Sequence, residues 1–88
     1  MSGSGQDDQV LIRRTLAALI EASTTADTCD AAGLADLAMH IRLRCFHAAN
    51  QSKAIYTRPL SAEERKMIAT HLRKLAALIA EAATHLKG

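Results

Sequence analysis

The chain has very few aromatic residues. Among its 88 residues there are one Phe, one Tyr and no Trp, so the hydrophobic content of 49% comes mainly from Ala, Leu and Ile. Small aliphatic side chains let backbones approach closely, but each of them buries little area. This composition excludes a core built around large rings. It favours helices packed against helices, in a core that would gain area from a partner.

Proline and long apolar runs are also scarce. There is one proline, and two of the four glycines lie in the first five residues. No apolar run approaches the ~20 residues of a membrane span, and no apolar segment of a secretory signal follows Met1–Gly5. From these absences we expect a cytoplasmic protein, bacterial in style, with no membrane partner.

Cysteine is represented only by Cys29 and Cys45, without a CxxC pair. On one helix the two residues would be ~24 Å apart, whereas the Cα atoms of a disulfide are typically about 4.4–6.8 Å apart. We therefore expect free thiols. With no zinc-finger or P-loop pattern in the chain, we expect no metal site and no cofactor.

The hydrophobic periodicity predicts an all-α fold: a three-helix antiparallel bundle that is completed as a homodimeric helical bundle. Residues 1–6 are expected to be a flexible leader or tag, and residues 7–88 a single helical domain with helices at about 7–25, 30–51 and 61–87. On the first helix, one face is shared by Ile12, Leu16, Leu19, Ile20 and Ser23.

Local signals set these helix boundaries. Residues 24–30, TTADTCD, have short polar side chains that compete with helical hydrogen bonds, so the first helix is expected to end before them. Thr28 or Asp30 is the expected N-cap of the second helix. Ser61 and Glu64 have the spacing of a capping box, which predicts the start of the third helix.

Two apolar stripes, about 140° apart, run along the second predicted helix. One consists of Leu34, Ala38, Ile41, Cys45 and Ala48, and the other of Ala35, Met39, Leu43 and Phe46. A surface helix needs only one such stripe. In addition, a third helix of ~40 Å would extend beyond a first helix of ~28 Å.

These features predict a small non-enzymatic interaction or regulatory protein that acts as a homodimer or binds another protein. The expected interface residues are Met39, Leu43, Phe46, Leu78 and Leu86. The alternative is a monomer in which the second stripe meets the 52–60 connection.

Residues 40–47, HIRLRCFH, collect two histidines, two arginines and a cysteine. His40 and His47 share a helix face but are ~10.5 Å apart along the axis, and Cys45 points elsewhere. One helix therefore cannot place them around one metal ion, because zinc–nitrogen bonds are only ~2.0–2.1 Å long. We interpret these histidines as part of a polar helix edge.

Arg42 and His47 also form an R-x4-H motif, and Arg65 and His71 form R-x5-H. In helical class, expected dimerisation and this motif the chain resembles the HEPN ribonucleases, all-helical dimers that carry R-x4-6-H in the dimer cleft. The resemblance covers six residues and implies that Arg42 and His47 would act on RNA phosphodiesters. Where that family commonly has a polar residue after the arginine, this chain has Leu43. A ribonuclease is thus the catalytic alternative.

The charge is unevenly distributed, with a net charge of −3 in residues 1–30, +3 in 31–60 and +2 in 61–88. A second alternative is therefore a nucleic-acid-binding regulator. Its phosphate contacts would come from Arg42, Arg44, Lys53, Arg58, Arg65, Lys66, Arg73 and Lys74.

Overall fold

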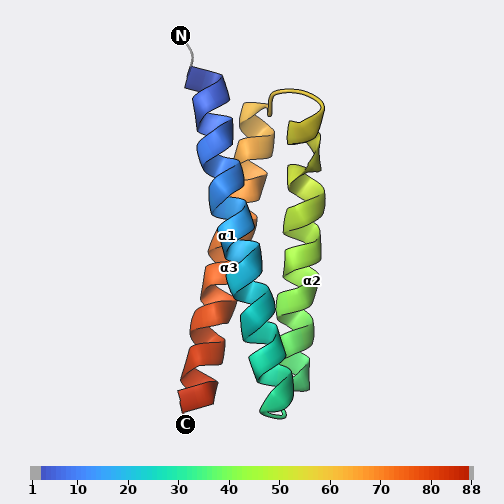
Figure 1. Cartoon of the computed structure of the whole chain (residues 1–88), viewed down its shortest axis with the longest axis vertical. Coiled ribbons are helices and arrows are strands. Elements are labelled where there is room, and N and C mark those ends of the chain that lie inside the picture. Colours follow the sequence, from blue (N-terminus) through green and yellow to red (C-terminus); the bar gives the residue numbers. More distant parts are fainter. Residues whose placement is uncertain (1–2, 88) are drawn as a thin grey trace.

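The structure of the chain, a computed structural model, describes residues 3–87 and the side chains of residues 8–54 and 57–87. It consists of the helices α1 (Gly3–Ala31), α2 (Ala35–Ser52) and α3 (Ala62–Lys87), with a short 3-10 helix, η1 (Lys53–Tyr56), after α2. α1 and α3 run in one direction and α2 runs in the other (Figure 1). Within the described residues there is no strand, and no helix is long and apolar enough to cross a membrane. The predicted all-α three-helix bundle is confirmed.

The first helix is longer than predicted. It ends at Ala31 rather than near residue 25, and it already includes residues 3–6 of the expected leader, whose residues 1–2 lie outside the described residues. The polar segment lies inside α1, where the hydroxyls of Thr25 and Thr28 donate to the carbonyl oxygens of Glu21 (2.8 Å) and Thr24 (3.1 Å). Hydroxyls bonded one turn back are satisfied inside the helix.

Gly33 sets the turn between α1 and α2. Its φ of 82° lies in the left-handed region that favours glycine. The N–H of Leu34 donates to the carbonyl of Cys29 (2.8 Å) and that of Gly33 to Asp30 (3.1 Å), which are the two hydrogen bonds of a Schellman motif. The prediction that Thr28 or Asp30 caps a second helix starting near residue 30 is therefore wrong. Both residues belong to α1, and α2 follows Leu34, which makes no side-chain cap.

The start of α3 agrees with the prediction. The backbone N–H of Glu64 donates to Ser61 Oγ (3.1 Å), and the backbone N–H of Ser61 donates to Glu64 Oε1 (2.8 Å). Arg58 Nη1 donates to the same carboxylate oxygen (2.7 Å) and fixes the carboxylate from the preceding loop. The capping box is thus formed, and α3 begins at Ala62, directly after its N-cap residue Ser61.

The core between the helices is built largely from alanine. Its buried cluster comprises Ala22, Ala26, Cys29, Ala38, Ile41, Ala48, Leu75 and Ala82. On α1 the buried positions Asp8, Thr15, Ala22 and Cys29 recur at every seventh residue. α1 therefore turns small or polar side chains inward, which allows close packing but buries little apolar area.

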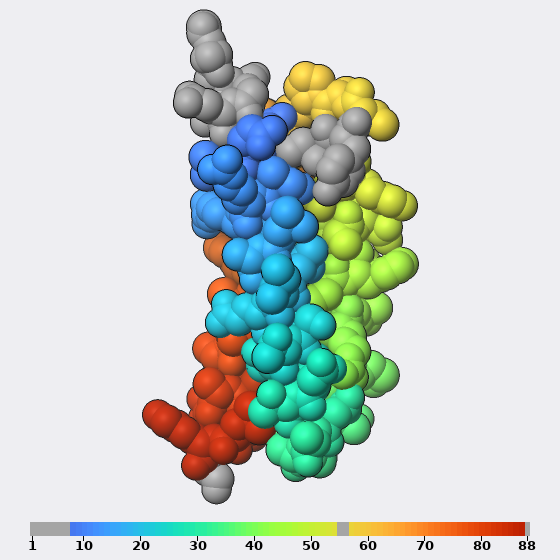
Figure 2. All heavy atoms as spheres, viewed as in Figure 1, coloured from blue at the N-terminus to red at the C-terminus, as the bar shows by residue number. Residues whose placement is uncertain are grey.

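The predicted difference in helix length is absent. With 29 and 26 residues, α1 and α3 are ~43 and ~39 Å long. The expected overhang of the third helix is wrong because α1 continues through the polar segment. The molecule is a rod of 49 × 18 × 17 Å (Figure 2). Its accessible surface of 5643 Å² exceeds the ~5000 Å² expected of a monomer of 9.4 kDa.

Candidate functional site

The second apolar stripe of α2 is open to solvent. The side chains of Met39, Leu43 and Phe46 are 58%, 53% and 61% exposed, whereas Ala38 and Ile41 of the first stripe are buried. The 52–60 connection does not cover the second stripe, as the monomeric alternative required. α2 therefore uses one stripe for the core and presents the other at the surface.

α1 continues this apolar surface. A shallow groove between α1 and α2 is lined by Leu19, Ser23, Arg42, Cys45, Phe46 and Ala49. Figure 2 shows α1 and α2 side by side along the length of the molecule. Leu16 and Ile20 lie three residues before Leu19 and Ser23, hence on the same side of α1, and are 48% and 69% exposed. We refer to Leu16, Ile20, Met39, Leu43 and Phe46 together as the apolar face.

Leu16 and Ile20 are site residues that the sequence reasoning missed, because it grouped them with Ile12 and Leu19 on one apolar face of the first helix. The structure buries a different face of α1, at Thr15, Ala22, Ala26 and Cys29. The sequence signal for this buried face was the repeat of small and polar side chains at every seventh residue of α1, from Asp8 to Cys29. Such positions let a neighbouring helix come close, and the larger side chains beside them are then left outside.

Arg42 and His47 contact different neighbours of α2: Arg42 binds α1, and His47 stacks on α3. Arg42 donates to Asp27 Oδ1 (2.8 Å) and to Asp30 Oδ2 (2.5 Å) of α1, and the pKa of Arg42 is raised by Asp30 first and Asp27 second. The ring of His47 stacks on that of His71 of α3, with a centroid distance of 6.3 Å. Within one protomer the R-x4-H motif therefore does not bring its two side chains to a common site.

The predicted interface residues of α3 are not part of the apolar face. α3 packs on the flank of α2 that carries His47, away from the groove lined by Phe46. Leu78 is half-buried against the core, and Leu86, 37% exposed, lies in the last turn of α3. The structure thus brings Met39, Leu43 and Phe46 together on one helix but separates them from Leu78 and Leu86.

Three of the eight basic residues proposed as phosphate contacts are held by carboxylates of the chain itself. Arg42 pairs with Asp27 and Asp30, Arg58 with Glu64, and Arg65 with Asp8. In the part of the chain that the structure describes, the other five make no ion pair: Arg44, Lys53, Lys66, Arg73 and Lys74. The predicted phosphate track is therefore interrupted by internal ion pairs.

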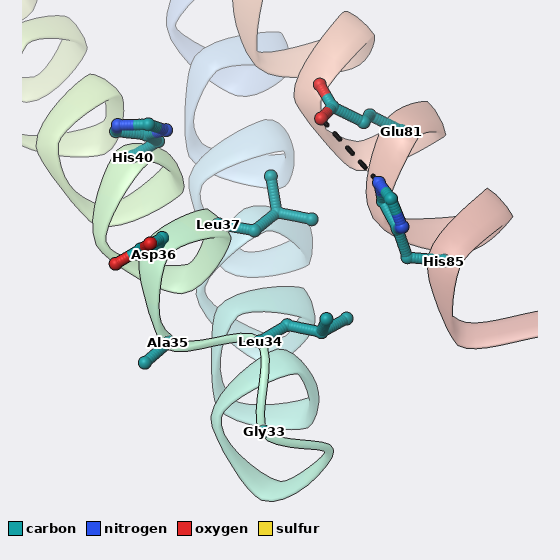
Figure 3. Close-up of a pocket in the computed structure, with 8 residues that line it drawn as sticks. All are labelled: Gly33, Leu34, Ala35, Asp36, Leu37, His40, Glu81 and His85. Carbon is teal, nitrogen blue, oxygen red and sulfur yellow. Dashed lines mark ion pairs between the residues drawn. The ribbon is translucent and has the colours of Figure 1, made fainter.

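All four histidines border the seam between α2 and α3. At one end, His40 and His85 line an open hollow between the start of α2 and the end of α3, where His85 Nε2 lies 3.8 Å from Glu81 Oε2 (Figure 3). At the other end, His47 stacks on His71. Among the described residues no three His, Cys, Asp or Glu side chains are grouped to hold a metal ion.

Both cysteines are free thiols on different helices. Cys29 is buried near the end of α1, and Cys45 is half-buried beside the groove between α1 and α2. Burial raises the pKa of the Cys45 thiol, which keeps it protonated and poorly nucleophilic. Neither cysteine is placed for nucleophilic catalysis.

No protein-family model matches the chain, and neither the curated proteins nor the solved structures gave a match. What the geometry defines is an elongated three-helix bundle with an alanine-rich core, an apolar face on α1 and α2, and a histidine-lined seam between α2 and α3.

Proposed function

We propose that the chain is a non-enzymatic interaction protein whose apolar face binds a second copy of the same chain. One observation supports this proposal above the others: five large apolar side chains on two neighbouring helices are about half exposed or more, beside a core made mainly of alanine. Removing apolar surface from water contributes about 25 cal/mol per Å². A chain that leaves these five side chains at the surface therefore gains substantially from covering them by association.

Size and symmetry favour a second copy as the occupant. One side of the rod measures 49 by 18 Å, which is enough for the about 800 Å² that each partner buries in a stable complex. A two-fold dimer needs only one self-complementary patch, and the apolar face is such a patch. In this arrangement α1 and α2 of one protomer pack on the same two helices of the other and form a four-helix layer.

The charges at the edge of the apolar face are compatible with this packing. Arg42 of α2 is paired with Asp27 and Asp30 of α1 beside the groove. These three charges compensate one another within the protomer, leaving one net negative charge. A second copy would therefore meet an ion cluster that is largely balanced, with little like-charge repulsion.

The test is the mass of the chain in solution, measured by sedimentation equilibrium over a range of concentrations. We expect the wild-type chain to form a dimer, and Phe46→Asp and Ile20→Asp to be monomers with unchanged helical circular dichroism. Met67→Asp is the matched control: Met67 is also an exposed apolar residue, 42% exposed, but it lies on α3 and outside the apolar face. This variant should remain dimeric.

Two results would count against the proposal. A wild-type chain that stays monomeric at its highest soluble concentration would exclude a second copy as the occupant. A dimer that persists in both Phe46→Asp and Ile20→Asp would place the interface on another surface of the bundle.

A further inference from the structure

Two pairs of basic side chains meet across the seam between α2 and α3. Arg44 and His47 lie three residues apart on α2, and His71 and Lys74 lie three residues apart on α3, so each pair shares one face of its helix. Arg44 Nη1 is 3.3 Å from His71 Nδ1, and the rings of His47 and His71 stack at 6.3 Å with an angle of 15°. Arg44, His47 and His71 therefore meet at one spot on the surface between α2 and α3, and Lys74 borders this spot one turn from His71. The ring of His47 also lies 6.0 Å from that of Phe46, at the edge of the apolar face.

The positive charge at this spot is not compensated. Arg42 has two carboxylates as partners, whereas the described residues include no ion pair of Arg44 or Lys74. The pKa of His71 is lowered by burial first, and then by the charges of Arg44, His47 and Lys74. A proton on His71 is therefore disfavoured until a negative charge is present.

The contact between Arg44 and His71 specifies a protonation state. A guanidinium only donates hydrogen bonds, so His71 accepts from Arg44 through an unprotonated Nδ1. Protonation of Nδ1 converts this acceptor into a donor and releases the N–H group of Arg44. Both groups then require an external acceptor. Several convergent N–H donors with multiple positive charges match an oxyanion that carries two negative charges.

We propose that Arg44, His47, His71 and Lys74 form a binding site for a doubly charged oxyanion, the phosphoryl group of a small phosphate monoester. The half-buried Arg44 and His71 form the base of the site, and the exposed His47 and Lys74 form its rim. The site does not require the proposed dimer, since all four of its side chains belong to α2 and α3 of one protomer.

The other charged groups near His71 are Glu63 and Lys66, which border the adjoining hollow on α3 together with Met67 and Thr70. Glu63 opposes an anion through its negative charge, whereas Lys66 favours one. Replacing the carboxylate in Glu63→Gln should consequently strengthen anion binding.

Sulfate is the appropriate probe, because it keeps two negative charges over the range from about pH 5 to about pH 8 in which histidine titrates. We would titrate the whole chain at constant ionic strength and follow the four imidazole rings by NMR. Sulfate should shift the signals of His47 and His71 and raise the pKa of His71. Binding should therefore become stronger as the pH falls, because protonated His71 adds a charge and releases Arg44.

Substitutions test which side chains bind the anion. Arg44→Gln and Lys74→Gln should each weaken sulfate binding at least about tenfold, as expected for the loss of one charge-assisted contact. Arg73→Gln is the matched control. Arg73 is next to Lys74 in the chain, but it donates to Thr70 Oγ1 and lies two residues from His71, so it points away from the site. Circular dichroism verifies that each variant keeps its helices.

Three outcomes would overturn the site. Sulfate could leave the signals of His47 and His71 unchanged, or Arg73→Gln could weaken binding as much as Arg44→Gln. Dimethyl phosphate, which carries one charge like a nucleic-acid diester, could bind as tightly as sulfate and phenyl phosphate. The last result would favour the nucleic-acid alternative. Ile20→Asp should retain sulfate binding, because Ile20 lies on α1, which contributes no residue to the site. This variant separates failure of the site from failure of the proposed dimer.

Discussion

The carboxylate of Asp8 accepts a hydrogen bond of 3.0 Å from the backbone N–H of Leu60, 52 residues further along the chain. Both residues are buried, at 6% and 4% exposure. Arg65 Nη1 contacts Asp8 Oδ1 (3.3 Å) and also donates to the carbonyl of Leu60 (2.8 Å). One carboxylate on α1 thereby satisfies a buried backbone donor in the loop before α3 and holds one end of the bundle together.

The first prediction concerns this tether. Asp8→Ala should lower the free energy of unfolding by about 1.5–3 kcal/mol, because the buried N–H of Leu60 loses a charged acceptor. Urea unfolding followed by circular dichroism measures this change. The protein concentration must be the same for each variant, since dimerisation would contribute to the apparent stability.

Two further variants define the contribution of the tether. Asp8→Asn retains an acceptor for Leu60 but loses the charge facing Arg65, so its effect should be smaller than that of Asp8→Ala. Glu21→Ala removes an exposed carboxylate in the middle of α1 that makes no ion pair among the described residues, and it should change stability by no more than about 0.5 kcal/mol. Equal effects of Asp8→Ala and Glu21→Ala would show that the tether contributes nothing.

The second prediction concerns stability in acid. Arg58 is the main cause that lowers the pKa of Glu64 from 4.5 to about 2, and the backbone N–H of Ser61 adds to this effect. A carboxylate with a lower pKa in the folded state stabilises the fold above its unfolded-state pKa. That contribution is lost as the pH falls through the window from 4.5 to about 2. The Tm of the wild-type chain should therefore decrease in this window.

Glu64→Gln isolates the charge, because glutamine can still occupy this position of a capping box. The variant should have a lower Tm than the wild type at pH 7, and the difference should disappear as the pH approaches 2. Thermal unfolding followed by circular dichroism at a series of pH values measures the difference. The control is Glu63→Gln, which leaves the Ser61–Glu64 bonds intact. A Tm difference for Glu64→Gln that is independent of pH would contradict this account.

The start of α3 could be predicted from the sequence because it depends on local chemistry. Ser61 and Glu64 satisfy each other's backbone N–H groups within four residues. Signals of this kind do not depend on the rest of the fold.

The course of α1 could not be predicted locally because tertiary contacts decide it. Residues 24–30 have low intrinsic helix preference. In the bundle, however, Ala26 and Cys29 are buried in the core, and Asp27 and Asp30 bind Arg42 of the next helix. These contacts keep the segment helical, and the turn moves to the glycine at position 33. The exposed stripe of α2 could be predicted from its periodicity, whereas the exposure of Leu16 and Ile20 depended on which face α1 buries.

The third prediction concerns Gly33. A Cβ atom at this position would meet no atom within 4 Å, so the cost of Gly33→Ala comes from the backbone φ of 82° alone. We expect this variant to be destabilised by about 1 kcal/mol. Gly33→Asn should be less destabilised, because asparagine tolerates the left-handed region better. Urea unfolding measures both variants. Equal free energies of unfolding for Gly33→Ala and Gly33→Asn would contradict the Schellman turn.

The fourth prediction tests whether the alanine-rich core is closely packed. Ala26 of α1 is fully buried among side chains of the core cluster, so Ala26→Leu has to push α1 away from its neighbours. Overpacking of this kind typically costs about 1–3 kcal/mol. Ile41→Ala removes one of the largest fully buried side chains and should cost about 2–5 kcal/mol. The control Ala77→Leu adds the same bulk at an exposed position of α3 and should change stability little.

Urea unfolding of each variant measures the free energy of unfolding. The dependence of this free energy on urea concentration should stay constant if only the folded state is affected. A stabilised Ala26→Leu would mean that α1 has room to accept a larger side chain, and that close contact between the helices is not what leaves Leu16 and Ile20 at the surface.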